Sequence, residues 1–221
     1  MNHPLRETSE RADVARLEKQ IDERLQQQLR ETDRLYTERL CQRYRDLVPP
    51  ERIQAVKDLP TVFEDRKHFE QSYLRDGDEK PPETVVGFSR NTLEPAHVAT
   101  DHLQMRKTTI HERLHQLSEP GSDRRLGKRL NEGITEDLAI KELGQEWNPE
   151  LLRSYPEERA VAHRVREVCG DTAVDRAYFQ GDVRELRSCL ERRLGKGNLD
   201  TLADMADRTG SSDRLPEDGG G

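Results

Sequence analysis

The sequence has few aromatic and few hydrophobic side chains, and it has no long apolar run. Phe, Trp and Tyr make up 5% of the 221 residues and hydrophobic residues 32%, whereas charged residues make up 37%. This balance leaves material for one core and predicts that part of the chain is a solvated helix or tail. Without a run of about 18 apolar residues, we expect no segment that spans a membrane.

An excess of positive charge is also missing. The formal net charge is −7, and acidic and basic residues are interspersed along the chain. A protein that binds nucleic acid needs a basic surface to neutralise phosphates, so we expect no nucleic acid partner. The first residues lack the apolar segment of a secretory signal. This absence favours a cytoplasmic location, with export by a signal-independent route left open.

Cysteine is scarce as well. The chain has three cysteines, Cys41, Cys169 and Cys189, and their odd number and wide spacing predict neither a disulfide framework nor a cysteine zinc site. We therefore expect all three to be small, reduced, buried side chains, as is usual in a cytoplasmic protein.

One stretch carries the residue types of a catalytic metal site. His111 and His115 are four positions apart, which on a helix places both imidazoles on one face, one turn apart. Two neutral imidazoles at this separation can bind one Zn²⁺. Glu112 stands next to the first histidine, where it can act as general base on a water molecule. A catalytic zinc needs a third protein ligand, and Glu132, beyond a loop that can reverse the chain, is the candidate.

This pattern resembles the gluzincin metallopeptidases. In that family two histidines of an H-E-x-x-H helix and a downstream glutamate of an N-E-G motif bind zinc, which matches His111, His115 and Glu132 here. The segment 131–136 is similar to the N-E-G-x-T-E segment of small bacterial domains of this type. The resemblance is firm over 108–136 and looser over 84–208. It implies a zincin-like domain with one Zn²⁺ per chain that hydrolyses peptide bonds, with Glu112 as the base.

Residues around the three ligands are expected to support them. Glu136 lies one helical turn after Glu132, so it can accept the free N–H of a zinc-bound histidine; the alternative is a partly solvated helix acid. Thr135 can act similarly through its hydroxyl group. We expect Asn131 to cap the second helix and Gly133 to let that helix approach the first one closely. Thr108 and Thr109 are expected to cap the start of the first helix, and His97 and His102 to be structural or to support the ligands.

Substrate contacts are predicted before the zinc motif. The segments 84–89 and 96–100 are typical of strands and can pair antiparallel. In the family that the chain resembles, the edge strand of such a sheet binds the substrate in extended form, and Val86, Gly87 and Phe88 are the candidates here. An ordinary structural hairpin is the alternative.

Further substrate contacts are predicted after the motif. The oxyanion of the reaction needs a hydrogen-bond donor, for which Tyr155 and His163 are the first candidates, followed by Tyr178. Four basic residues within 123–130 either contact carboxylates of the substrate or belong to a solvated loop.

The remaining segments are predicted to be mostly helical. Residues 1–50 form an N-terminal extension with an apolar stripe over 14–29, which is typical of a coiled coil or partner-binding helix, a helix folded back on the domain, or an inhibitory prosegment. Residues 51–208 form the metallopeptidase domain, with helices at 51–59, 62–74 and 147–194 and a last short helix at 199–205. Residues 209–221 are predicted to be disordered. The predicted fold is α+β, mostly helical, with a small sheet that has an antiparallel edge.

A zinc-dependent peptidase acting on a protein or peptide is therefore the function that the sequence favours. One alternative is a secreted toxin or effector protease that cleaves a host or competitor protein. The other is a non-catalytic interaction module on a metallopeptidase fold, in which the N-terminal helix binds the partner. The intact Glu112 argues against the non-catalytic module.

Overall fold

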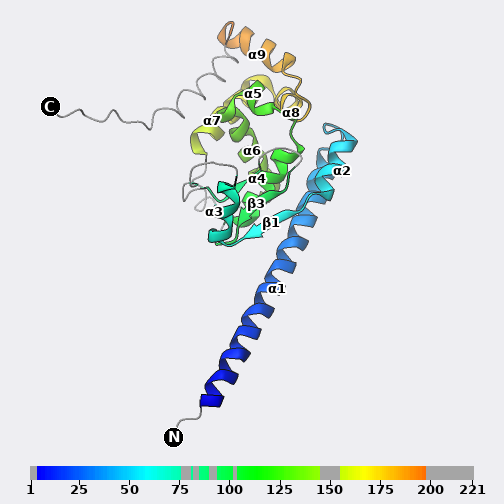
Figure 1. Ribbon diagram of the computed structural model, residues 1–221. Helices are drawn as coiled ribbons and strands as arrows, with labels where there is room; N and C mark the ends of the chain where they lie inside the picture. Colours follow the sequence, from blue (N-terminus) through cyan, green and yellow to red (C-terminus); the bar gives the residue numbers. More distant parts are fainter. Residues whose placement is uncertain are drawn as a thin grey trace, which may run out of the picture.

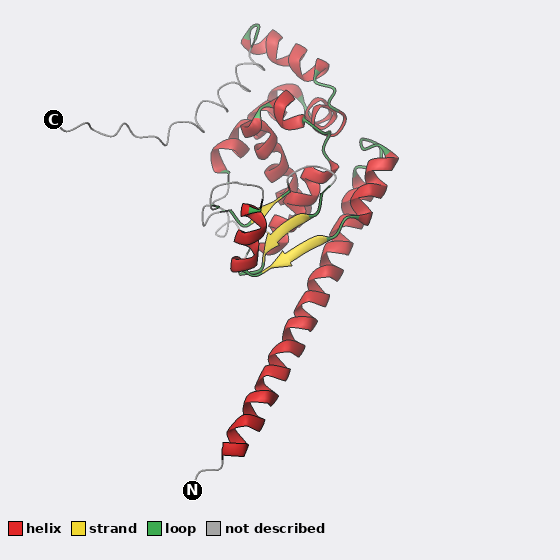
Figure 2. Cartoon of the chain, in the orientation of Figure 1, coloured by secondary structure: helices red, strands yellow, loops and turns green. Residues whose placement is uncertain are grey.

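Helices make up most of the chain in the computed structural model, and three short strands form a sheet beside them (Figure 1, Figure 2). Over the described residues the fold is mostly helical α+β, as predicted, and it contains nine helices. The predicted helix at 199–205, the tail at 209–221 and His102 lie outside these residues. The structure describes residues 4–75, 81, 85–89, 94–101, 104–144 and 155–197.

The sheet has the strand order β1-β3-β2, so β2 is an edge strand. β2 (Gly87–Phe88) pairs antiparallel with β3 (Ala96–Ala99), which confirms the predicted pairing. β1 (Thr61–Glu64) pairs parallel with β3, although the sequence analysis assigned this segment to a helix. That assignment is wrong because the helix α3 (Arg66–Leu74) begins only after Asp65, whose carboxylate caps it. Before this cap the chain is extended and completes the sheet.

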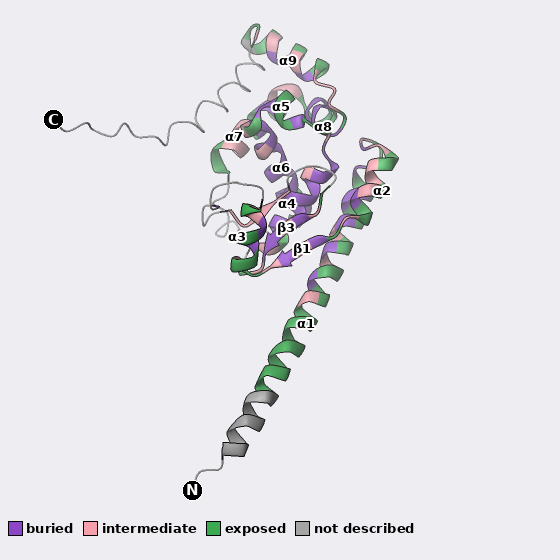
Figure 3. Ribbon diagram, in the orientation of Figure 1, coloured by how far each residue is buried: buried purple, intermediate pink, exposed green. Residues whose placement is uncertain are grey.

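The long helix α1 (Pro4–Arg43) has two halves with different surroundings (Figure 3). The N-terminal half projects away from the other elements, and the apolar side chains of its stripe, from Val14 to Leu25, are 42–66% exposed. The C-terminal half packs on the domain, where Leu40 and Cys41 are buried. Here Asp33 accepts two hydrogen bonds from the guanidinium of Arg113, at 2.8 and 2.6 Å. The packed half of α1 thus belongs to the core that packs against the helix carrying His111 and His115.

The main core joins the packed half of α1 to the helix that carries His111 and His115 and to the helices that follow it. Ile110, Leu114 and Leu117, which the sequence analysis predicted to face inwards, are fully buried. No helix in the described ranges is both long and apolar enough to cross a membrane. The helices of this region, together with the helix that precedes the sheet, are α2 (Pro50–Asp58), α4 (Met105–Leu117), α5 (Ser122–Leu126), α6 (Lys128–Leu143), α7 (Pro156–Cys169), α8 (Asp171–Gln180) and α9 (Arg184–Leu194).

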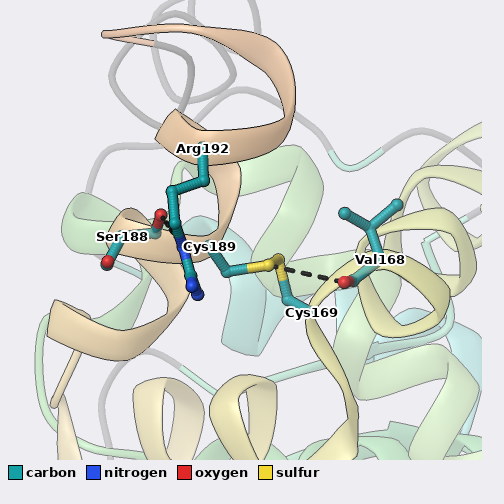
Figure 4. The surroundings of a disulfide bond; sticks show 5 residues. All are labelled: Val168, Cys169, Ser188, Cys189 and Arg192. Carbon is teal, nitrogen blue, oxygen red and sulfur yellow. Dashed lines mark hydrogen bonds between the residues drawn. A yellow bond between two sulfur atoms is a disulfide. The ribbon is translucent and has the colours of Figure 1, made fainter.

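A disulfide joins Cys169 at the end of α7 to Cys189 in α9 (Figure 4). The prediction of three reduced cysteines is therefore wrong for these two, whereas Cys41 is free and buried, as predicted. The two cysteines are 20 residues apart, but the packing of α7 against α9 brings their Cα atoms to 5.6 Å. That separation is typical of a disulfide, and it arises from tertiary packing that sequence spacing does not reveal.

Candidate metal centre

Two neighbouring helices position the candidate ligands. α4 carries His111, Glu112 and His115, and α6 carries Glu132. Both helices begin earlier than predicted. The N-cap of α4 is Gln104, so the predicted caps Thr108 and Thr109 lie inside the helix, and the N-cap of α6 is Gly127, so Asn131 does too. Apolar side chains of both helices are buried in the same core, and the two helices pack against each other.

The three ligand atoms converge at nearly equal distances. Nε2 of His111 lies 3.1 Å from Nε2 of His115 and 3.2 Å from Oε2 of Glu132, and Nε2 of His115 lies 3.4 Å from the same oxygen. For zinc–ligand bonds of about 2.05 Å, the edge of a tetrahedron is about 3.3 Å. The three side chains therefore already have the spacing of three corners of a tetrahedral metal site, and they are the one such group among the described residues.

Buried hydrogen bonds to Glu136 orient the first histidine, His111. Oε2 of Glu136 lies 3.1 Å from Nδ1 of His111, and the other oxygen accepts a hydrogen bond of 2.8 Å from Nζ of Lys107. Because an ionised carboxylate only accepts, Nδ1 carries the proton, and the lone pair of the neutral ring is on Nε2, towards the other ligands. Glu136 thus lies where the sequence analysis placed it. Lys107 was missed, although its position one helical turn before His111 puts it on the same face of α4.

The charge of the site also fits a divalent cation. Glu112 and Glu136 are buried, Glu132 is partly buried, and Lys107 is the buried cation beside them. Three carboxylates and one ammonium leave a charge of −2 when both histidines are neutral, and a divalent cation would cancel it. In the metal-free protein, burial lowers the pKa of His111, but its contacts with Glu132 and Glu136 outweigh burial and raise this pKa to about 10. Proton and metal thus compete for one negative site.

Glu112 directly follows the candidate ligand His111 and lies against the edge strand. Burial raises the pKa of its carboxyl group, an effect that the neighbouring His111 and His115 oppose. Gly87 of β2 passes so close that a Cβ there would be 2.3 Å from Cγ2 of Thr108 and 2.9 Å from Oε1 of Glu112. Only glycine fits, so the strand backbone borders the candidate base directly.

The candidate ligands open into a cavity of about 690 Å³. Two of the three candidate substrate contacts, Gly87 and Phe88 of the edge strand, line it, whereas Val86 pairs with β3 through its carbonyl oxygen. Tyr155 also lines the cavity, and its ring stacks on that of His111 with the centroids 5.7 Å apart. Burial and the nearby Glu132 raise the pKa of Tyr155, so its hydroxyl stays protonated. None of the described residues of α1 lines this cavity, so the described part of α1 does not cover it as an inhibitory prosegment would.

Several candidates have other partners. His163 is exposed on α7 and pairs with Glu167, away from the cavity, because its helix turns it outwards. The hydroxyl of Thr135 donates a hydrogen bond to the carbonyl of Asn131 and contacts the hydroxyl of Tyr178. Neither of these bonds involves a candidate metal ligand.

Gly133 and His97 serve the packing of the domain. A Cβ on Gly133 would be 2.1 Å from the carbonyl oxygen of Glu158. This glycine therefore allows α7, and not α4 as predicted, to pack closely against α6. His97 pairs with Glu64 and stacks on Phe88, which is a structural role in the sheet.

Comparison of the chain with models of protein families, with curated proteins and with solved structures finds no match in any of the three.

Proposed function

We propose that the protein is a zinc-dependent peptidase. The observation that carries this proposal is the convergence of His111, His115 and Glu132 at the edge lengths of a tetrahedron, with Glu136 fixing the orientation of one ring. Structural zinc sites have four protein ligands, whereas three ligands that face a cavity are typical of a catalytic site. A bound zinc ion would lower the pKa of a coordinated water and polarise a substrate carbonyl.

The side chains around the site have the chemistry that peptide hydrolysis needs. Glu112 accepts a proton from the attacking water as the oxygen–carbon bond forms. It then gives this proton to the amide nitrogen as the carbon–nitrogen bond breaks. The hydroxyl of Tyr155 is a hydrogen-bond donor on the same cavity and would stabilise the oxyanion. The edge strand β2 offers its backbone to an extended peptide beside Glu112.

Metal content and hydrolysis of a peptide library test this function together. We expect about one zinc per chain by mass spectrometry, as in other sites with three protein ligands. His115→Ala should lose the metal. Glu112→Gln should keep the metal and lower kcat by a factor of about 10²–10⁴, because a general base contributes that much. Full hydrolytic activity in the zinc-loaded Glu112→Gln variant would refute the assignment of the base.

The disulfide between Cys169 and Cys189 favours the secreted effector protease as a second candidate. Disulfides persist in oxidising compartments and are rare in a reducing cytoplasm, so this bond supports export over the cytoplasmic location. The site chemistry would be the same, but the substrate would be a protein of a host or competitor. Toxicity to target cells that disappears with Glu112→Gln supports this candidate, and toxicity that persists contradicts it. A partner for the exposed half of α1 stays a prediction.

A further inference from the structure

The four basic residues that follow the zinc helix fall into two groups. Arg125 pairs with Glu119, at 3.9 Å, and Arg129 pairs with Glu157 and Glu158. In contrast, the side chains of Arg124 and Lys128 form no hydrogen bond or ion pair with any described residue, and both line the cavity of the candidate metal centre. The loop interpretation is wrong, because these residues lie in α5 and in the first turn of α6. Acidic partners account for Arg125 and Arg129, but not for the position of the two unpaired cations on the cavity.

The position of Lys128 puts a positive charge next to the reaction. Lys128 is four residues before Glu132 on α6 and therefore on the same face, with about 5–6 Å between the Cβ atoms. An extended peptide advances about 3.3 Å per residue, so this distance corresponds to about two residues from the scissile bond.

Acidic groups at this end of the cavity do not cancel the two cations. Glu119 lines the cavity but is held by Arg52 and Arg125. Asp123 is a single carboxylate beside two cations, Arg124 and Lys128. With Glu119 paired, the side chains of Asp123, Arg124 and Lys128 together carry a net positive charge.

Polar side chains also line the cavity together with the two cations. Ser122 donates a hydrogen bond of 2.9 Å to Oδ1 of Asn131, and Ser118 donates to the carbonyl of His115. Asn131 is only 4% exposed, yet it lines the cavity, and its Nδ2 has no hydrogen bond within the described part of the chain. This amide can donate to a carboxylate oxygen that sits between the two cations.

We propose that Arg124, Lys128 and Asn131 form a subsite for a carboxylate of the substrate, so that the enzyme prefers an acidic residue within two positions of the scissile bond. The inference rests on the proposed peptidase function for its cleavage readout, but binding tests it separately. A terminal carboxylate has the same chemistry as an acidic side chain. The peptides must therefore separate the two sources.

The experiment compares four fluorescent peptides that share one sequence. One has a Glu at the tested position and a C-terminal amide, one has Gln there and an amide, and two have Gln and a free C-terminus at a short or a long distance from the scissile bond. We expect kcat/KM to be about 10–100-fold higher for the Glu peptide than for its Gln amide, mostly through KM, because charged hydrogen bonds of this kind are worth about tenfold each. A preference confined to the short free C-terminus would overturn the side-chain preference and assign the subsite to a terminal carboxylate.

Charge variants identify the residues. The double variant Arg124→Gln and Lys128→Gln should bring kcat/KM for the Glu peptide to the level of the Gln amide, since the charged contact is lost. Lys128→Glu should reverse the preference towards a Lys peptide. Arg125→Gln is the matched control, because this neighbouring arginine is paired and does not line the cavity. An equal loss of the Glu preference in the control would overturn the assignment.

Binding to the Glu112→Gln variant, measured by fluorescence anisotropy, separates the two proposals. Tighter binding of the Glu peptide without hydrolysis by the parent protein would leave the subsite in place and contradict the peptidase function. Equal binding of Glu and Gln peptides would refute the subsite, whatever the parent protein hydrolyses. The Glu preference should also weaken at high ionic strength, because the two cations are exposed to solvent.

Discussion

Replacing Glu136 by glutamine should weaken zinc binding without unfolding the protein. The carboxylate is fully buried and accepts from two donors, Nδ1 of His111 and Nζ of Lys107. A glutamine has only one acceptor end, so its amide nitrogen must face one of these donors. His111 is then no longer held in the orientation that directs Nε2 to the metal. Losses of this kind lower metal affinity about 10–100-fold, which is about 1.4–2.7 kcal/mol.

The assay is a competition titration of zinc between the protein and a chromophoric chelator. Glu142→Gln is the matched control, because Glu142 is also a buried carboxylate on α6 and accepts from Tyr44 instead of a candidate ligand. Both variants should lose some stability, but only Glu136→Gln should bind zinc more weakly. If the two variants bind zinc equally, the loss reflects general damage to α6. If Glu136→Gln binds as tightly as the parent protein, the proposed orientation of His111 is refuted.

Three further predictions concern the surroundings of the site. Gly133→Ala should lower the free energy of unfolding by about 3 kcal/mol, measured with urea, because a Cβ would overlap the backbone of Glu158; an unchanged midpoint would contradict this contact. Gly87→Ala should lower hydrolysis about a hundredfold, because a displacement of about 1 Å near a base has this effect, while zinc content stays at the parent level; loss of zinc would show that the damage is not confined to Glu112. Serine at both positions of the α7–α9 disulfide should lower stability by about 3 kcal/mol in oxidised protein only, and an equal loss under reducing conditions would point to packing instead.

The features that could be predicted from sequence depend on neighbours along the chain. The spacing of His111 and His115 fixes their relative position as soon as a helix forms, and the helix is indicated by buried residues such as Ile110 and Leu114. The antiparallel pair β2–β3 was predicted because a short connection limits how two strands can meet. The spacing of the sequence made Glu132 only a candidate third ligand, and the resemblance to the gluzincin metallopeptidases supported its assignment.

The features that could not be predicted depend on contacts between distant segments. β1 pairs parallel with a strand 35 positions further on, and parallel pairs leave no turn signal in the sequence. The disulfide depends on how α7 packs against α9. The four basic residues after the zinc helix look alike in sequence, and only the fold shows that Arg125 and Arg129 have acidic partners whereas Arg124 and Lys128 line the cavity.

The same contrast explains how α1 relates to the site. Its apolar stripe continues with one period from Val14 to Leu29, so the sequence does not show where the helix leaves the domain. In the structure the change falls at the end of this stripe, where Leu29 is buried and Asp33 forms its two hydrogen bonds with Arg113. Removing one partner of a buried ion pair is strongly destabilising, at about 3–5 kcal/mol, because the other charge stays buried and unpaired. Arg113 directly follows Glu112, on the face of α4 that points away from the cavity. The packed half of α1 therefore supports α4 on the side opposite the cavity, whereas a partner for the exposed half stays a prediction.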